Sequence, residues 1–263
     1  LVGSEMCIRD RNIPIRDNDG RELRKLFIAR APDRVLIDAD YSQIELRLLA
    51  HFSGCKELIE AYKEGQDIHA LTASQVFSVP IGDVSDAQRR AAKAVNFGII
   101  YGISDFGLAS NLNISAKQAG EYIKKYFETY SDVKKYMDSN VEFARQNGYV
   151  TTLLGRKRVI NEIKSSNYNI RSFGERAAMN MPLQGSSADI IKIAMLRVYE
   201  RLKREGLRSE LILQVHDELV IDAYESEADR VSELLQYEME NAVQLKVPLV
   251  AEVRRGKNWY EAK

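Results

Sequence analysis

The sequence has 263 residues, which is enough for one large domain or two interleaved ones with a sizeable core. Hydrophobic residues make up 45% of the chain and charged residues 29%, and 38 basic residues balance 38 acidic ones. The zero net charge excludes the overall basic excess that marks many nucleic-acid-binding proteins, so such a site would need local clustering. Two cysteines, Cys7 and Cys55, exclude a disulfide framework and a zinc knuckle.

No uninterrupted apolar run approaches the ~20 residues that span a bilayer, and the N-terminal residues lack the apolar region of a signal peptide. We therefore expect a soluble cytoplasmic protein that makes no membrane contact. Neither internal repeats nor low-complexity segments occur, so no flexible linker is expected to divide the chain.

The first informative stretch covers residues 35–49. Its short apolar run, Val35 to Ile37, predicts a buried strand, and Asp38 and Asp40 follow directly. Ser42 is a candidate N-cap for a helix, because apolar residues recur at helical spacing after it. A carboxylate between a strand and a helix lies near solvent, where its oxygens suit Mg²⁺. A helix cap is the other interpretation, and the pattern alone favours it. The apolar helical positions are Ile44, Leu48 and Leu49.

Helical sequence continues through residues 55–64, and a new segment starts at residues 65–69. The segment contains His69. A lone histidine is more often a structural or surface residue than a functional one, so the pattern leaves its role open.

Residues 86–102 predict one helix on which every fourth residue belongs to a single stripe. The order along the stripe is cation, cation, aromatic, aromatic: Arg89, Lys93, Phe97 and Tyr101. Such a stripe can bind a triphosphate through its cations while a base packs beside the aromatic ring. Spacing alone favours an ordinary amphipathic helix with solvated cations. In that interpretation Ala91, Ala92 and Val95 are buried.

Two more helices and a hairpin are predicted next. Ser115 and Gln118 form a capping-box pattern before a helix that runs to about residue 130, and a second helix covers about 132–146 before Gly148. Residues 149–160 predict a hairpin that turns at Leu154 and Gly155. A basic cluster beside the turn is a candidate phosphate contact. Its members are Arg156, Lys157 and Arg158.

Pro182 and Gly185 predict a break after the segment that begins at residue 175, with a long helix from Ser186 to just before Gly206. Polar residues at intervals of four form one edge of the first segment if it is helical, and they suit minor-groove acceptors. They are Arg176, Asn180 and Gln184.

Two apolar runs at residues 211–221 flank His216, Asp217 and Glu218, which predicts an antiparallel hairpin with acids at its tip. A simple polar turn is an equally good interpretation of that pattern. Two adjacent carboxylates on buried strands are costly unless a cation or solvent compensates them. A helix at about 226–242, a strand at 247–253 and a core position for Trp259 complete the prediction.

Three of these stretches together resemble the motifs of the family A DNA polymerases, in the same order. They are Asp40–Arg47 (DYSQIELR), Arg89–Gly102 (R-x3-K-x3-F-G-x2-Y-G) and His216–Glu218 (HDE), and the resemblance extends from Asn12 to Lys263. It implies an α+β fold in which a palm with a mostly antiparallel sheet carries an inserted helical fingers subdomain.

The resemblance also divides the chain. Residues 12–58 and 171–263 correspond to the palm and residues 59–170 to the fingers, while the thumb and exonuclease domains of a full member are absent. Residues 1–11 do not match the family, and we interpret them as foreign or junction sequence.

The reaction implied by the resemblance is that of a DNA-directed DNA polymerase in replication and repair. A primer 3′-OH attacks the α-phosphorus of a deoxynucleoside triphosphate and pyrophosphate leaves. Asp40 and Asp217 correspond to ligands of two Mg²⁺ ions ~3.5–4 Å apart, with Tyr41 also at the metals. Glu218 supports the metals, and Lys93 supplies a proton to the pyrophosphate.

Further site residues follow from the same resemblance. Glu45 corresponds to the residue that excludes the ribose 2′-OH, and Arg89 and Lys93 to residues that bind the triphosphate. The other residues implied in nucleotide binding are Phe97, Tyr101, His69 and Gln43. Those implied in DNA binding are Arg16, Arg176, Asn180, Gln184 and His216. The expected partners are primer-template DNA and deoxynucleoside triphosphates, and the expected state is a monomer in the bacterial cytoplasm.

Two rival functions stay open at this point. A single-subunit RNA polymerase shares the palm chemistry, but Glu45 and the complete DYSQIELR run argue against it. A nucleic-acid-binding module that has lost its chemistry is the other rival, and the presence of all motif acids argues against that one.

Overall fold

The computed structural model describes residues 22–263, and residues 1–11 and Arg16 therefore lie outside the described part. The chain forms two compact units. Of the described residues, the sheet unit contains 22–44 together with Ala188–Gln244 and Leu249–Lys263, and the helical unit contains Glu45–Ser187 and Leu245–Pro248. The division into a palm at 12–58 and 171–263 and fingers at 59–170, which the resemblance implies, stays a prediction.

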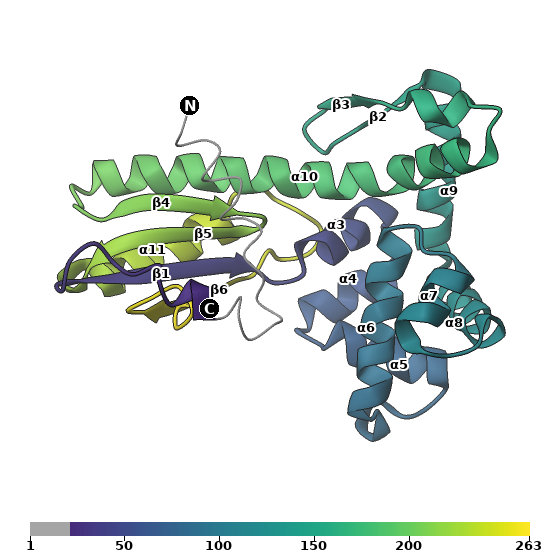
Figure 1. The fold of residues 1–263 in the computed structure, drawn as a ribbon, viewed down its shortest axis with the longest axis horizontal. Coiled ribbons are helices and arrows are strands. Elements are labelled where there is room, and N and C mark those ends of the chain that lie inside the picture. The colour runs from purple at the N-terminus through teal and green to yellow at the C-terminus, as the bar shows by residue number, and fades with distance from the viewer. Residues whose placement is uncertain (1–21) are drawn as a thin grey trace. The chain divides into compact units, whose positions relative to one another are not determined.

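The sheet unit is built on a four-stranded antiparallel sheet with the order β4-β5-β1-β6 (Figure 1). Its strands are β1 (Arg34–Tyr41), β4 (Glu210–Val215), β5 (Glu218–Tyr224) and β6 (Ala251–Gly256). Strand β1 is central and buried almost throughout, which confirms the predicted strand at Val35–Ile37 and extends it to both sides. The helices between residues 44 and 204 and the small hairpin lie between β1 and β4 in sequence, so the predicted α+β class with an inserted helical region is confirmed.

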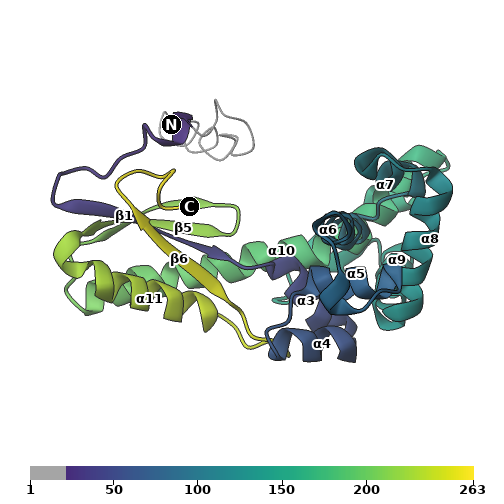
Figure 2. The same cartoon turned by 90° about the horizontal axis from the view of Figure 1, so that it is seen from below.

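Helix α11 (Ala228–Glu240) packs along the sheet beside β1 and β6 (Figure 2), where a helix at about 226–242 was predicted. A one-turn 3₁₀ helix, Glu225–Glu227, leads into it. Trp259 is fully buried, as predicted, with its ring 5.4 Å from that of Phe27 and the Arg24 guanidinium 4.1 Å above it. The strand predicted at 247–253 is wrong in position, because β6 begins only at Ala251. Pro248 has no N–H for a strand ladder and its carbonyl accepts from Arg47 instead.

The helical unit is built mainly from short helices, several of which begin or end with a capping residue. Ser115 forms the predicted capping box with Gln118, and Ser85 forms a second capping box with Gln88 that was not predicted. Gly148 ends a helix with a φ of +79°, as predicted for a C′ glycine. The helices are α3 (Ile44–Ser53), α4 (Lys56–Lys63), α5 (Ile68–Phe77), α6 (Asp86–Ile100), α7 (Asp105–Leu112), α8 (Ala116–Thr129) and α9 (Ser131–Asn147), with a 3₁₀ turn at Ile81–Asp83.

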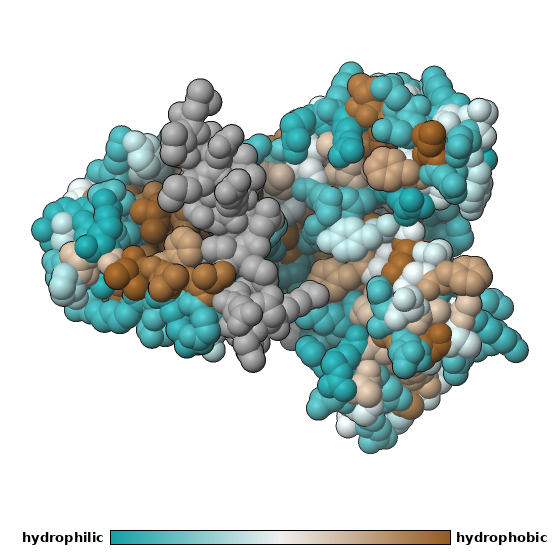
Figure 3. Space-filling view, in the orientation of Figure 1, coloured by the Kyte–Doolittle hydropathy of each residue, from teal (hydrophilic) through white to brown (hydrophobic). Residues whose placement is uncertain are grey.

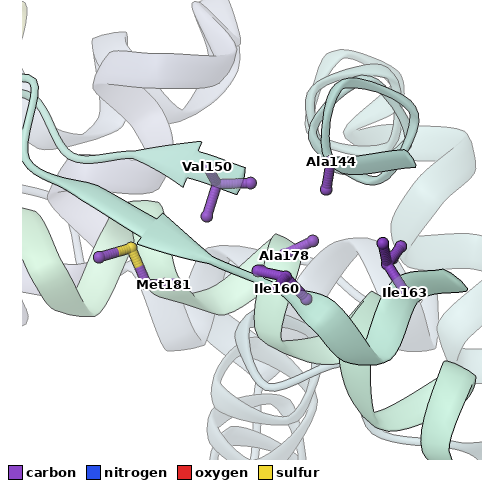
Figure 4. Packing of buried hydrophobic residues seen from close by; sticks show 6 residues of the cluster. All are labelled: Ala144, Val150, Ile160, Ile163, Ala178 and Met181. Carbon is purple, nitrogen blue, oxygen red and sulfur yellow. The ribbon is translucent and has the colours of Figure 1, made fainter. Parts of the chain in front are cut away.

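The predicted hairpin forms from β2 (Tyr149–Thr151) and β3 (Lys157–Val159), with Tyr149 opposite Val159 and Gly155 in the turn at a φ of +78°. A 3₁₀ turn, Asn161–Lys164, follows it. Apolar side chains beneath the hairpin pack it against α9 and the long helix described next (Figure 4). The members of this core are Ala144, Val150, Ile160, Ile163, Ala178 and Met181.

Helix α10 (Tyr168–Arg204) is continuous, so the predicted break at Pro182 and Gly185 is wrong. Proline has no N–H, so the carbonyl of Ala178, four residues earlier, loses its usual helical donor, yet the helix continues. The hydroxyl of Ser186 donates to the carbonyl of Pro182, and Arg156 Nη2 donates to the carbonyl of Gly185 at 2.9 Å. Gly185 fits because a Cβ there would lie 2.6 Å from Cγ2 of Thr152 in the hairpin. The helix ends two residues before Gly206, as predicted.

Apolar residues are visible at the surface over the sheet unit (Figure 3). The exposed large side chains of this unit include Leu196, Tyr199 and Ile212. Within residues 22–263, no helix combines the length and the apolar character needed to cross a membrane.

Candidate active site

The acidic residues of the first and third motifs meet in the sheet unit. Asp40 lies near the end of β1, and Asp217 lies in the two-residue turn between β4 and β5. Asp40 is paired with Glu218 in the ladder between β1 and β5, and the N–H of Tyr41 donates to the carbonyl of Asp217 at 3.1 Å. Residues far apart in sequence are thus neighbours because two antiparallel strands pair at this end.

The carboxylates at this end of the sheet have unsatisfied oxygens. Oδ1 of Asp40 and Oε1 of Glu218 are buried without a hydrogen-bond donor among the described residues. The ammonium group of Lys263 contacts Oε2 of Glu218 and lies 3.8 Å from Oδ2 of Asp40. A buried carboxylate oxygen without a donor is costly, and a cation removes that cost. The end of the sheet therefore attracts positive charge.

A hard divalent cation fits this set of oxygens. In the described part of the chain, no three or more His, Cys, Asp or Glu side chains form a group that could hold a metal. A metal at Asp40 and Asp217 would therefore complete its ligands with backbone oxygens, waters or substrate, as Mg²⁺ commonly does. The side chain of Tyr41 is not available for this purpose, because it is buried and its hydroxyl donates to the carbonyl of Met239 at 2.7 Å. Only backbone atoms of Tyr41 can serve the predicted metal site.

A third carboxylate, Asp38, lies two residues before Asp40 on β1 and is buried. Burial raises its pKa to about 6, although Lys263 and the hydrogen bond from Trp259 act in the opposite direction. The indole Nε1 of Trp259 donates to Oδ2 of Asp38 at 3.1 Å. A small cavity of about 110 Å³ opens between these groups. Its lining residues are Asp38, Asp40, Glu252, Arg254, Ala262 and Lys263.

Two further predicted residues adopt left-handed backbone conformations beside the acids. Gln43 has a φ of +54°, between β1 and α3, and His216 has a φ of +51° in the β4–β5 turn. Residues other than glycine rarely adopt such angles, and they do so mainly at tight turns and functional sites. The side chain of His216 is exposed, and its carbonyl accepts from Nε2 of Gln214 at 2.7 Å.

Helix α6 of the helical unit carries the predicted stripe. Arg89 and Lys93 are exposed, Phe97 is half-buried, and Tyr101 caps the C-terminal end with 44% of its surface exposed. The opposite side of the helix is buried through Ala92 and Val95. The arrangement is that of an amphipathic helix whose polar side is a continuous row of cations and rings.

The cations of the stripe are not isolated. Nε of Arg89 lies 2.6 Å from Oδ2 of Asp67, which also caps α5 through Oδ1. His69, in the first turn of α5, is 2% exposed, and its ring centroid lies 5.9 Å from that of Phe97. Burial lowers the pKa of His69 to about 4, with smaller contributions from Lys93 and Arg89, so its ring is neutral at pH 7.

Glu45 and the polar edge of α10 meet at the C-terminal end of α6. The hydroxyl of Tyr101 donates to Oε2 of Glu45 at 3.0 Å, and Gln184 also hydrogen-bonds this carboxylate. Burial raises the pKa of Glu45 in spite of both hydrogen bonds. Nδ2 of Asn180 donates to the carbonyl of Ile100 at 3.4 Å.

Arg176, the first residue of this polar edge, hydrogen-bonds Ser172 through Nη1 at 2.8 Å. Its aliphatic part lies so close to Gly102 that a Cβ at that glycine would be 2.8 Å from Cγ of Arg176. The structure therefore brings the three predicted α10 residues to the end of α6, and Gly102, at a φ of +64°, permits the approach.

The basic residues of the hairpin make different kinds of contact. Arg156 has a structural contact through the carbonyl of Gly185, while the ammonium of Lys157 lies 4.5 Å above the ring of Tyr149. Lys157 and Arg158 are exposed.

Three residues at these sites were not predicted: Asp67, Asn96 and Lys263. Asp67 precedes the apolar start of α5, where an N-cap aspartate is a recognisable signal. Asn96 contacts Nδ1 of His69 at 3.0 Å, and Lys263 contacts Glu218. Both contacts depend on tertiary structure and leave no pattern in the sequence.

Comparisons with known proteins give a consistent result. The model of the family described as DNA polymerase family A matches residues 11–261. DNA polymerase I of Caldicellulosiruptor bescii is 58% identical over 252 residues, which are 96% of this chain and 30% of that protein. DNA polymerase I of Geobacillus stearothermophilus is 53% identical over 96% of this chain and 29% of its own length.

A solved structure agrees with these matches. It is described as the POL domain of Pol1 from M. smegmatis in complex with DNA primer-template and dNTP, and it matches with a TM-score of 0.92 at 45% identity. The match covers 96% of this chain and 44% of that one. The chain spans about 30% of the length of the curated relatives named above. The match over residues 11–261 shows that this chain belongs to DNA polymerase family A.

Proposed function

We propose that this chain catalyses template-directed transfer of deoxynucleotides to a primer 3′-OH, as the nucleotidyltransferase part of a DNA polymerase used in replication and repair. The observation that carries the proposal is the pairing of Asp40 with Glu218 and of Tyr41 with Asp217, which gathers the motif carboxylates at one end of the sheet. The solved relative was bound to primer-template DNA and dNTP, which supports the same partners here.

In the proposed reaction, the primer 3′ oxygen forms a bond to the α-phosphorus, and the bond from that phosphorus to the bridging oxygen breaks. Its electron pair leaves with pyrophosphate, and the 3′ hydroxyl proton passes to solvent. Asp40, Asp217 and the Tyr41 carbonyl would hold two Mg²⁺ ions, and Glu218 would add negative charge beside them. The chemistry that bound Mg²⁺ supplies is activation of the 3′-OH and neutralisation of charge on the leaving group.

The helical unit would contribute the triphosphate contacts. Arg89 and Lys93 present exposed cations on α6, and such groups form charge-assisted hydrogen bonds to phosphate oxygens. Nζ of Lys93 would donate a proton to the departing pyrophosphate. Phe97 and Tyr101 follow on the same helix, where planar rings suit packing against a base.

Sugar and DNA contacts complete the proposal. Glu45 is held by Tyr101 and Gln184, and a carboxylate held in place can exclude a ribose 2′-OH by its volume. The remaining nucleotide contacts are assigned to His69 and Gln43. The DNA contacts are assigned to Arg16, Arg176, Asn180, Gln184 and His216. The chain would act as a single copy, in the bacterial cytoplasm, where its substrates occur.

Primer extension on a primed template with Mg²⁺ and deoxynucleotides tests this function. We expect Asp40→Asn and Asp217→Asn each to reduce extension more than about a hundredfold, the loss typical of removing one electrostatic contribution to the transition state. The matched control is Asp229→Asn on α11, since Asp229 is exposed and pairs with Arg255. Extension that persists in both motif variants contradicts the proposal.

A second measurement covers the case in which the chain alone does not extend a primer. Binding of dATP is then measured with the chain and with Arg89→Ala and Lys93→Ala. Binding that depends on both cations supports the assignment and points to a requirement for the rest of the relatives' length. Absence of both extension and binding contradicts the active-site assignment.

A further inference from the structure

A line of four polar side chains crosses the interior of the helical unit, and we name it the buried polar chain. It runs from Tyr130, at the C-terminal end of α8, through Thr72 on α5 and Asn96 on α6 to His69 on α5. All four residues are at most 2% exposed. The hydroxyls of Tyr130 and Thr72 are 3.4 Å apart, Oγ1 of Thr72 lies 3.2 Å from Oδ1 of Asn96, and Nδ2 of Asn96 lies 3.0 Å from Nδ1 of His69.

The donor and acceptor chemistry of these groups fixes the direction of every hydrogen bond in the buried polar chain. Oδ1 of Asn96 can only accept, so the Thr72 hydroxyl donates to it and is free to accept from the hydroxyl of Tyr130. The Asn96 amide then faces His69 with its nitrogen, which can only donate. Nδ1 of His69 must accept that hydrogen bond and carries a lone pair. In a neutral imidazole the proton is therefore on Nε2.

The Nε2 atom of His69 is the end of the buried polar chain that can still form a hydrogen bond to a ligand. It has no hydrogen-bond partner in residues 22–263 and is not among their fully buried unpartnered atoms, so Nε2 keeps a small accessible area although His69 as a whole is only 2% exposed. The cations Arg89 and Lys93 act electrostatically on the same ring, and the Asp67 carboxylate acts on it in the opposite direction. Phosphate oxygens accept hydrogen bonds and do not donate them when ionised. An Nε2–H beside two cations suits a phosphate oxygen, whereas an Nε2 lone pair repels it.

We propose that Asn96 is a positioning residue that holds His69 as the Nε2–H tautomer, so that His69 donates a hydrogen bond to a phosphate oxygen of the nucleoside triphosphate. The inference rests on the proposed function, because it deepens the triphosphate contacts assigned to α5 and α6. Thr72 and Tyr130 act behind Asn96 by fixing which end of its amide faces the ring. The role of Asn96 is thus to select a tautomer, and it touches no substrate.

The imidazole tautomers can be read by ¹⁵N–¹H NMR of the histidine-labelled chain, without nucleotide. Only three histidines are present, and His51 is an internal reference because its Nδ1 accepts from the N–H of Lys246 at 3.0 Å. Substitution of His51 and His216 assigns the signals. We expect Nε2–H patterns for His51 and His69 at pH 7.5. A His69 that is protonated on Nδ1, or that averages both tautomers, overturns the proposal.

Two variants, at Asn96 and at Thr72, test the buried polar chain at different positions. Asn96→Asp places an acceptor opposite Nδ1, and we expect His69 to carry a proton there while His51 is unchanged. Thr72→Val removes the hydroxyl that orients the amide, and we expect His69 to show a mixture of both tautomers. Thr72→Val is close to isosteric and keeps the measurement possible if Asn96→Asp does not fold. A His69 pattern that stays unchanged in the folded variants contradicts the proposal.

Binding of dATP then connects the tautomer to function. We expect Asn96→Asp to weaken binding about tenfold, the loss of one charge-assisted hydrogen bond. In a His69→Gln background the same substitution should have little further effect, because a glutamine amide donates without a tautomer. If Arg89→Ala weakens binding and Asn96→Asp does not, the positioning role of Asn96 is contradicted while the proposed function stands. If neither affects binding, the proposed function fails with it.

Discussion

Nε of Arg89 lies 2.6 Å from Oδ2 of Asp67, and the other oxygen of the same carboxylate accepts from the N–H groups of His69 and Ala70 at 2.9 and 3.2 Å. One side chain thus caps α5 and holds the first-turn cation of α6. The ion pair restricts the rotamers of Arg89 before any substrate binds, which reduces the entropy lost when the guanidinium meets a phosphate.

Two substitutions at Asp67 separate its roles in stability. Asp67→Asn keeps a capping oxygen and removes the ion pair, whose side chains are 40% and 44% exposed, so the free energy of unfolding should fall by less than about 1 kcal/mol. Asp67→Ala also removes the cap and should cost about 1–2 kcal/mol. Urea denaturation at pH 7 measures both values. Equal losses in the two variants would show that the cap contributes nothing.

The ion pair also predicts a pH dependence of stability. Burial acts to raise the pKa of Asp67, but hydrogen bonds from Arg89, Ala70 and His69 outweigh it and hold the pKa below its usual value. A lowered pKa in the folded state stabilises the fold above the unfolded pKa of about 3.9, and this contribution is lost as the pH falls through the folded pKa. The stability difference between the wild type and Asp67→Asn should therefore shrink below about pH 4. A difference that stays constant into that range contradicts this account.

Lys263 should compete with a divalent cation for the carboxylates of the sheet unit. Its ammonium contacts Glu218 and lies 3.8 Å from Asp40, so Lys263→Gln removes a positive charge from the place that a metal would neutralise. Binding of Mn²⁺, followed by electron paramagnetic resonance without nucleotide, should become about fivefold tighter, which corresponds to about 1 kcal/mol. Lys257→Gln is the matched control because Lys257 pairs with Glu225. Equal effects of both substitutions would exclude local competition.

The end of β6 should not tolerate a side chain at Gly256. A Cβ there would lie 2.6 Å from the backbone nitrogen of Ala262 and would also collide with Glu261. Gly256→Ala should therefore lower the free energy of unfolding by about 1–3 kcal/mol, the usual cost of overpacking. Gly82→Ala is the control, because a Cβ at Gly82 meets no atom within 4 Å. Thermal unfolding of both variants measures the difference, and similar melting temperatures would refute the collision.

Glu45 should determine the choice between deoxy- and ribonucleotides if the proposed function holds. Glu45→Ala opens the space that a 2′-OH needs, and ribonucleotide incorporation should rise roughly tenfold or more relative to deoxynucleotides. Tyr101→Phe should have a smaller effect, since Gln184 still hydrogen-bonds the carboxylate. Competition between the two nucleotides in primer extension measures both ratios. A larger effect of Tyr101→Phe would mean that volume at Glu45 is not the cause.

Local patterns predicted most of the elements because their causes are local. The capping box at Ser115 and the glycine at 148 lie within a few residues of the helix ends that they determine. Helix α10 was different, because it continues through Pro182 and Gly185 among tertiary contacts that no local pattern shows, such as the hydrogen bond from Arg156 of a separate hairpin to the carbonyl of Gly185. Strand β6 was displaced for a similar reason, since the carbonyl of Pro248 is used by Arg47.

In the candidate site too, residues in recognisable motifs were predicted, and residues that depend on distant contacts were not. Resemblance to known motifs indicated Asp40, Asp217 and the α6 stripe, and the structure places the two acids at neighbouring strand ends. It offered no signal for Asn96 or Lys263, whose contacts form only when distant segments pack together. Supporting residues of this kind are visible only in the folded chain.

The pairing of Asp40 with Glu218 has a consequence for folding fidelity. Successive residues of a strand point to opposite faces, so a slip of β1 by one position would bring Ala39 opposite Glu218 and turn Asp40 to the other side. Such a chain would still have four hydrogen-bonded strands, yet its acids would be dispersed. A misregistered fraction would therefore be folded by spectroscopic criteria and inert as an enzyme, and a shortfall in active-site titration would reveal it.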